Sequence, residues 1–348
     1  MVLISVRDLL WRRRRVLVAV VVTGMVFGIS LLMAGTEYTL FEDGRRIVGS
    51  FDADAWIVAD GASGPFTATT PLPAGVAHDV EDDAGVSQAA PVVILHSSAD
   101  AEPPRDVNVI GYEPGAFVAA TVSSGRDLAA PGEAVADVAL DLEVGDVVVV
   151  GGMALDVVGL AEQVTWYFGT PTVFVAAADA QAMAFRGEPL AMAIATQGVP
   201  QDLPSGVRAM DDAAVIADLE RPLASSTETI RLLNGLLWVV AAGVIGSMIY
   251  LSAIERTRDL AVFKATGATN AGLLGGLLLQ AIVLCALAGG VGVLVAWALV
   301  PIFPFSVEIP GSVYLRLVVL VVAVALVASI GGMRRTVRVE PARAFAGG

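Results

Sequence analysis

Residues 16–36 read VLVAVVVTGMVFGISLLMAGT and contain no charged side chain, although positions 12–15 directly before them are all arginine. An α-helix rises 1.5 Å per residue, so ~20 apolar residues cross the ~30 Å hydrocarbon core of a membrane. The sequence therefore predicts a membrane-spanning helix at 16–36, preceded by an Arg-rich amphipathic segment at 1–15.

Three more runs lack charged side chains: residues 232–254, 265–307 and 317–333. The second run is too long for one crossing and ends among prolines, so we expect a helix at 271–300 and an outer loop at 301–312. Residues 313–315 lengthen the last run, and Arg316 can extend its guanidinium to the interface. The runs lack the alternation of a membrane β-barrel. The prediction is four transmembrane helices, at 16–36, 232–254, 271–300 and 313–333.

Composition excludes several other classes of protein. The chain has 348 residues, of which 56% are hydrophobic and 16% charged, so neither a disordered chain nor a wholly soluble globule fits. A single cysteine, Cys285, excludes an internal disulfide framework, and two histidines are too few for most imidazole metal sites. With 35 acidic against 21 basic residues, we expect no nucleic-acid partner.

Basic residues set the expected orientation. Twelve of the 21 basic residues fall in three short segments, 1–15, 255–270 and 334–348. Short basic segments remain cytoplasmic, and four crossings place all three on one side. We therefore expect a plasma-membrane protein with both termini cytoplasmic and residues 37–231 outside. A cleaved signal peptide is the alternative for 1–35, but its apolar run would be only ~7–15 residues, which favours a retained helix.

Residues 37–231 are predicted to form an α+β extracytoplasmic domain inserted between the first and second helices. Its strand-like stretches are 54–60, 91–96, 107–111, 172–175 and 192–196, and its helical stretches are 37–50, 178–185 and 211–219. Gly151-Gly152 joins two further apolar stretches, 144–150 and 153–159, in the pattern of a tight β-hairpin.

The chain lacks the residues of an ATP site. The lysine of a P-loop reaches the terminal phosphates, but the sole lysine here, Lys264, lies between Phe263 and Ala265. We expect no enzyme activity, no catalytic residue, no bound metal and no cofactor. The acidic run Glu81-Asp82-Asp83 lacks the pattern of a calcium loop and is interpreted as a solvated turn. The uncharged spans also lack an ion-coupling device.

The segment 255–270, ERTRDLAVFKATGATN, lies between the second and third predicted helices. Arg256, Leu260 and Phe263 share one helical face, and Gly267 stands where a helix C-terminal glycine is common. This predicts a short amphipathic helix at the membrane surface. Two interpretations remain open for it: contact with lipid headgroups, and docking of a cytoplasmic partner.

These residues carry a family resemblance. The stretch ERTRDLAVFKATGATN resembles the cytoplasmic segment of FtsX-like (MacB-type, type VII) ABC transporter permeases. The Arg-rich start, the large domain after the first helix and the three C-terminal helices agree with it. The tail 337–345, VRVEPARAF, resembles the closing motif of the family, with Glu340-Pro341 where Asp-Pro is commoner.

The resemblance implies a permease subunit moved by a separate cytoplasmic ABC ATPase, which uses ATP and Mg, so that this chain binds no cofactor itself. The outer domain would then move to export or extract a substrate. The implied coupling residues are Glu255, Arg256, Arg258, Asp259, Phe263, Lys264 and Gly267. The alternatives are ATPase-driven signalling to an outer cell-wall hydrolase, and a membrane-anchored binding domain without an ATPase.

Small residues form faces on two of the predicted helices. They are Gly24 and Gly28 in the first, and Gly272, Gly276, Ala288, Gly292 and Ala296 in the third. Such faces let helix backbones approach closely. The spacing is equally compatible with packing inside one chain and with contact to a second permease copy, identical or paralogous. The resemblance favours two copies, with membrane lipid around them.

Overall fold

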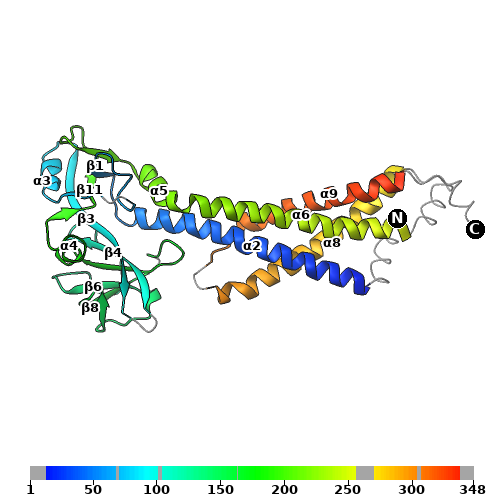
Figure 1. Ribbon diagram of the computed structural model, residues 1–348, viewed down its shortest axis with the longest axis horizontal. Coiled ribbons are helices and arrows are strands. Elements are labelled where there is room, and N and C mark those ends of the chain that lie inside the picture. Colours follow the sequence, from blue (N-terminus) through cyan, green and yellow to red (C-terminus); the bar gives the residue numbers. More distant parts are fainter. Residues whose placement is uncertain are drawn as a thin grey trace, which may run out of the picture. The chain divides into compact units, whose positions relative to one another are not determined.

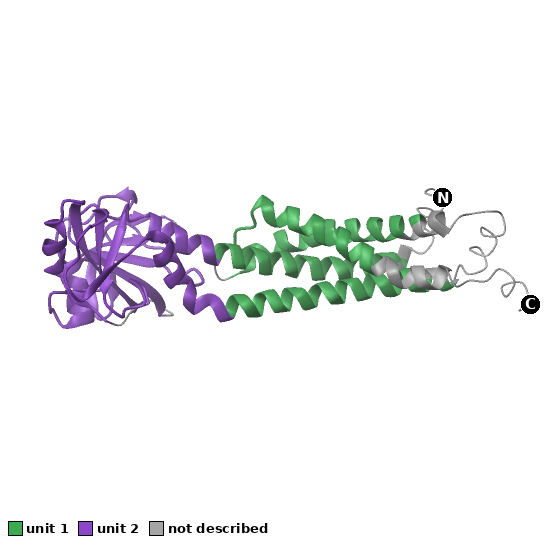
Figure 2. Ribbon diagram, turned by 90° about the horizontal axis from the view of Figure 1, so that it is seen from above, with its two compact units in different colours: residues 1–39, 226–348 green, residues 40–225 purple. Residues whose placement is uncertain are grey.

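The computed structural model describes residues 13–67, 70–100, 104–162, 164–255, 270–303 and 307–337. These form two compact units (Figures 1 and 2). The helical unit lies within residues 1–39 and 226–348, and the sheet unit comprises residues 40–225.

Four long helices supply the helical unit: α2 (Arg13–Gly49), α6 (Ala224–Glu255), α8 (Asn270–Leu299) and α9 (Gly311–Val337). Among the described residues, three segments are long and apolar enough to cross a membrane: Val16–Gly49, Asp212–Leu251 and Leu278–Ile302. Gly311–Val327 is a shorter apolar helix, so the fourth crossing stays a prediction. The predicted membrane span at 16–36 and the predicted helical stretch at 37–50 form one continuous helix, which ends at Gly49.

The core of the helical unit is built from aliphatic side chains and very few aromatic ones. Its buried residues include Phe27, Leu31, Ile245, Ile249, Leu284, Cys285, Leu317 and Val324. Many equally apolar side chains are exposed, including Leu17, Leu232, Val239, Leu294, Trp297 and Val319. In water such a surface would be unfavourable, whereas in a bilayer it faces lipid tails of the same polarity. The pattern of exposure thus agrees with membrane-embedded helices.

The sheet unit contains a ten-stranded sheet among the described residues, in the order β12-β1-β11-β3-β4-β9-β6-β8-β5, with β7 paired to β3 and β8. A two-stranded sheet pairs β10 with β2. The strands are β1 (Ala55–Ala59), β2 (Leu72–Pro73), β3 (Val86–Ala99), β4 (Arg105–Tyr112), β5 (Val122–Gly125), β6 (Glu133–Asp137), β7 (Val147–Val150), β8 (Met153–Ala161), β9 (Thr172–Ala176), β10 (Leu190–Ala191), β11 (Ala193–Gly198) and β12 (Val207–Met210).

Pairing in the large sheet is mostly antiparallel, but β4–β9 and β6–β8 are parallel. Three short helices accompany the strands: α3 (Val76–Glu81), α4 (Ala177–Phe185) and α5 (Asp212–Glu220). The predicted helices at 178–185 and 211–219 correspond to α4 and α5, and each strand-like stretch corresponds to an observed strand. The sheet-rich architecture confirms the expected mixture of strands and helices.

The predicted hairpin is present as β7 and β8. Its two turn residues, Gly151 and Gly152, have φ values of 59° and 80°. A two-residue turn with both φ values positive matches the right-handed twist of the strands, and glycine adopts it without steric cost. The first strand of the hairpin begins at Val147, three residues later than predicted, because Val144 and Gly145 form a turn that the Asp146 N–H closes on the carbonyl oxygen of Glu143.

An aromatic cluster fills the main core of the sheet unit. The ring centroids of Phe51 and Trp56 lie 5.1 Å apart, those of Trp56 and Phe66 6.0 Å, and those of Phe66 and Trp166 5.7 Å. The first and third pairs are edge-to-face, with interplanar angles of 81° and 83°, and such pairs contribute ~0.5–1.5 kcal/mol beyond their buried area. Phe51 follows the end of α2, so the C-terminal end of that helix is fixed to this core.

The acidic run at 81–83 has a local structural role. The carboxylate of Asp83 accepts hydrogen bonds from the backbone N–H groups of Asp202, Gly85 and Gln201, at 2.9, 2.7 and 3.1 Å. These bonds, that from Asp202 foremost, hold the pKa of Asp83 below its usual value, because they favour the ionised form. Asp83 thus fixes the loop after β11 to the turn before β3.

Candidate functional site

The predicted coupling residues lie at the connection between α6 and α8. Glu255 is the last residue of α6, and α8 begins at Asn270. The other six, Arg256, Arg258, Asp259, Phe263, Lys264 and Gly267, lie outside the described residues. Their role as the contact for an ATPase therefore stays a prediction, and the described site is the set of helix contacts around α2.

Helix α2 packs against α8 through glycine. A Cβ atom placed on Gly24 would lie 2.5 Å from Val291 Cγ1 and 3.0 Å from the carbonyl oxygen of Ala288. On Gly28 it would lie 2.8 Å from Val295 Cβ, and on Gly292 it would lie 2.8 Å from Phe27 Cβ. No side chain fits at these distances, so the two backbones are in close contact.

This contact brings predicted small residues together within one chain. Gly24 and Gly28 meet Ala288 and Gly292, and Ala296 is buried further along α8. Of the two interpretations of these faces, packing inside the chain is the one that the structure contains. Gly272 and Gly276 lie in the first turns of α8. A contact between two permease copies stays a prediction.

Helix α2 meets α6 through polar side chains. The hydroxyl of Ser30 donates a hydrogen bond to Oδ1 of Asn234 at 2.6 Å, and Trp238 Nε1–H donates to Ser30 Oγ at 3.0 Å. Ser30 and Asn234 are both buried. In double-mutant cycles, hydrogen bonds between membrane helices contribute ~0.6 kcal/mol on average and ~1.7 kcal/mol at most. This hydrogen-bonded contact therefore fixes the orientation of the two helices but contributes little to the free energy of unfolding.

One end of the same seam carries charges. Arg231 Nε lies 2.7 Å from Oε1 of Glu37, joining α6 to α2. The backbone N–H of Glu308 donates to Thr39 Oγ1 at 2.8 Å, and the Thr39 hydroxyl donates to the carbonyl oxygen of Gly35 at 3.1 Å. These bonds fix the segment before α9 to this end of α2.

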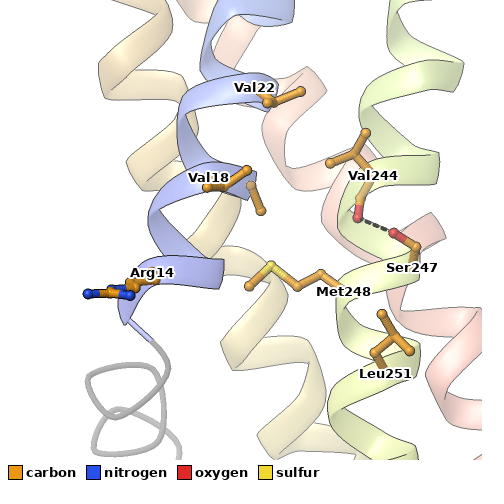
Figure 3. Close-up of a pocket in the computed structure, with 8 residues that line it drawn as sticks. Arg14, Val18, Val22, Val244, Ser247, Met248 and Leu251 are labelled. Atoms are coloured by element: carbon orange, nitrogen blue, oxygen red, sulfur yellow. Dashed lines mark hydrogen bonds between the residues drawn. The ribbon is translucent and has the colours of Figure 1, made fainter.

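Two apolar grooves flank α2 and α6. The first has a volume of about 460 Å³ and is lined by α2 and α6 (Figure 3). Its residues are Arg14, Val18, Ala19, Val22, Val244, Ser247, Met248 and Leu251. The Ser247 hydroxyl bonds to the carbonyl oxygen of Val244 in its own helix at 2.8 Å, so it offers little polarity to the groove.

The second groove is larger, about 710 Å³, and lies among α2, α6 and α9. Its residues are Ser30, Leu31, Ala34, Glu37, Arg231, Asn234, Trp238, Val313, Leu315, Arg316, Leu317, Val319, Leu320 and Ala323. In the described part of the chain, no group of three or more His, Cys, Asp or Glu side chains could hold a metal ion. Both grooves present mainly apolar side chains.

Comparison with known proteins identifies the family. Residues 231–341 match the family model described as the FtsX-like permease C-terminal. An ABC transporter permease of Mycobacterium tuberculosis is 36% identical over 348 residues, which is 100% of both chains. The chain belongs to the FtsX-like, MacB-type family of ABC transporter permeases. The resemblance seen in the segment 255–270 and the tail is thereby confirmed.

Further similarities cover all or part of this permease. An ABC transporter permease of Mycobacterium bovis is also 36% identical, over 100% of both chains. The macrolide export ATP-binding/permease protein MacB of Rhodopseudomonas palustris is 29% identical over 192 residues, 47% of this chain and 29% of MacB. The solved periplasmic region of MacB from Actinobacillus actinomycetemcomitans covers 50% of this chain and 95% of its own, at 11% identity and a TM-score of 0.37.

The polar residues of the α2–α6 seam were not among the predicted site residues of this permease. Ser30 and Asn234 lie in long uncharged runs, and from the sequence each could belong to a lipid-facing or a buried position. A lone amide in a predicted membrane helix is costly unless it finds a partner, which is the signal that could have singled out Asn234. Its partner could not be named from the sequence, because 204 residues separate the two.

Proposed function

We propose that this permease couples ATP hydrolysis by a separate cytoplasmic ATPase to movement of the sheet unit, and so exports or extracts a substrate at the outer face of the membrane. Family membership supports a transmembrane subunit that works with an ATPase. The sequence itself lacks a lysine in a phosphate-binding context, so ATP and Mg belong to the partner.

The continuity of helix contacts is the observation that carries this proposal. Helix α6 ends at Glu255, the first residue of the predicted docking segment, and it is hydrogen-bonded to α2 through Ser30 and Asn234. Helix α2 runs without interruption from Arg13 to Gly49, so it contains residues of both units. In this proposal, a displacement applied near Glu255 passes from α6 to α2, and α2 carries it to its own residues in the sheet unit.

The proposal includes the topology expected from the basic residues. Four crossings, with both termini and the segment 255–270 in the cytoplasm, place the sheet unit outside. The tail and the segment 255–270 then face the ATPase together, and the acidic sheet unit faces the substrate. An amine-reactive reagent that cannot cross the membrane tests this topology. We expect it to label Lys264 in inverted vesicles and not in right-side-out vesicles.

Charge reversal at Arg258 tests the coupling. In the complex co-expressed with its ATPase, Arg258→Glu is expected to reduce co-purification of the ATPase and its stimulated ATP turnover at least tenfold. Arg45→Glu reverses an exposed charge in the sheet unit and should change neither. Assembly and turnover unaffected by Arg258→Glu would contradict docking at this segment.

A second permease copy is part of the same proposal. Two copies would pair with two ATPases, and since Gly24, Gly28 and Gly292 are occupied by intrachain packing, the copies would meet through another face. Native mass spectrometry of the purified complex is expected to give a mass of two permeases and two ATPases. A complex with a single permease would contradict this part.

A further inference from the structure

The larger groove has an apolar wall and a charged mouth. Glu37 and Arg231 lie at the end where Thr39 and Glu308 join α2 to the start of α9. Arg316 follows only five residues after α9 begins at Gly311, so it lies toward that same end. Two arginines and one glutamate thus stand at the mouth, and the remaining lining residues are uncharged.

The polar atoms in the wall are occupied by each other. The Ser30 hydroxyl donates to Asn234, and the indole N–H of Trp238 donates to the Ser30 oxygen. Polar groups that already have partners do not need water, so the groove presents apolar surface to a ligand. Leu31, Ala34, Leu317, Leu320 and Ala323 complete this surface.

The dimensions match one lipid chain. The groove follows α9 from Val313 to Ala323, and ten helical steps of 1.5 Å give ~15 Å. This is half of the ~30 Å hydrocarbon core, the depth that one leaflet fills. The volume of about 710 Å³ lies within the ~300–1,000 Å³ typical of small-molecule pockets.

We propose that this groove is a specific binding site for an anionic phospholipid, with one acyl chain along α9 and its phosphate at Arg316 and Arg231. Glu37 neutralises one of the two arginines. Arg316 makes no ion pair within the described residues, and the charged side chains that line the groove, two arginines and one glutamate, carry a net positive charge that a phosphate would complement. A second copy of the chain fits less well, because a two-fold contact centred on the groove would bring the four arginines together.

The test compares lipid retention by the full-length permease and its variants. The protein is purified in mild detergent, exposed to equal amounts of phosphatidylglycerol and phosphatidylcholine of the same chain length, and analysed by native mass spectrometry. Wild type is expected to retain one phosphatidylglycerol in preference to phosphatidylcholine. Arg316→Gln should lower this preference about fivefold, the contribution of one basic residue near an anionic surface.

A pair of neighbouring residues separates the groove from the general lipid-facing surface. Val322 and Ala323 are both exposed on α9, but only Ala323 lines the groove. Ala323→Trp should fill the groove and abolish retention of the lipid, and Val322→Trp should leave retention unchanged. Thermal unfolding of both variants reports whether either fails to fold.

Three outcomes would overturn the proposal. They are equal retention of the two lipids by wild type, equal preference in wild type and Arg316→Gln, and equal retention in the two tryptophan variants. A dimer that dissociates in Ala323→Trp but not in Val322→Trp would assign the groove to a second copy. Arg258→Glu should keep the lipid, so failure of ATPase coupling and failure of lipid binding are distinguishable.

Discussion

In the helical unit Gly292 lies against Phe27 and the backbone of α2, whereas in the sheet unit Gly152 has nothing within 4 Å of the position where a Cβ would stand. Gly292 is glycine because of space, and Gly152 is glycine because of its φ of 80°. The two units thus need the same residue for different reasons. Substitutions that tolerate a positive φ but add volume should therefore destabilise the helical unit more than the sheet unit.

The largest effect is expected at the α2–α8 contact. Gly292→Leu would push α8 away from α2 and should cost ~3 kcal/mol of stability, the upper range for overpacking. Gly290, two residues earlier, has open space around it, so Gly290→Leu should change stability little. Thermal unfolding of the permease in detergent measures both, and similar losses in the two variants would show that the contact is not close-packed.

The hairpin turn should give the next largest effect. Gly152→Val forces a β-branched residue into a left-handed conformation and should cost ~1–2 kcal/mol. Asparagine tolerates that conformation, so Gly152→Asn should recover most of the loss. At position 292 asparagine should be no more stable than alanine, because there the lack of space, and not the backbone conformation, destabilises every side chain. Denaturant unfolding followed by tryptophan fluorescence distinguishes these cases. If asparagine restored stability at both positions, the two glycines would not be required for different reasons.

The polar seam sharpens the comparison inside the helical unit. Ser30→Ala leaves Asn234 and Trp238 without their shared partner and should cost ~1 kcal/mol, within the range for membrane hydrogen bonds. In an Asn234→Leu background the same change should cost much less, because the bond is already absent. A double-mutant cycle on thermal stability gives the coupling directly, and strictly additive losses would contradict a Ser30–Asn234 bond.

The smallest effect concerns a surface ion pair of the sheet unit. Arg126 binds Glu133 at 2.8 and 2.5 Å, and the hydrogen bonds from Arg126, followed by those of the Ala129 and Ala130 N–H groups, lower the pKa of Glu133 to about 2. The depressed pKa means that the pair stabilises the fold above about pH 4.5, and that this is lost as the pH falls toward about 2.

Because Arg126 is 53% exposed, solvent screens the pair and its contribution to the free energy of unfolding should be small. Glu133→Gln should therefore lower the free energy of unfolding slightly at neutral pH, and the difference from wild type should shrink in acid. The exposed Glu113→Gln serves as the control. A difference that does not depend on pH would mean that the carboxylate is not held by its charge.

Sequence reasoning located the elements whose signal is local. Long uncharged runs mark α2, α6 and α8 because the rise of a helix fixes the length of a crossing, and Gly151-Gly152 marks its hairpin because few residues adopt that turn. Strand β6, Glu133–Asp137, was missed because its small residues show no alternation, although four of its five residues are buried. The six residues of α3 are too few for a helical period.

The site could be predicted only where one helix carries the signal. Gly24 and Gly28 define a face of α2, but their spacing does not say whether α8 or a second copy covers it. Folding brings Ser30 within hydrogen-bond distance of Asn234, and it places Arg231 and Arg316 at the same groove. Such pairings depend on how distant segments meet, which single-helix periodicity does not contain.

The lone thiol has a practical consequence. Cys285 is fully buried in the core of the helical unit, away from aqueous reagents. Thiol reagents should therefore label the unmodified chain only weakly. A cysteine introduced at a surface position would be the main site of labelling. Spin labels or fluorophores could then follow the distance between α2 and α6 during the proposed ATPase-driven movement without first redesigning the protein.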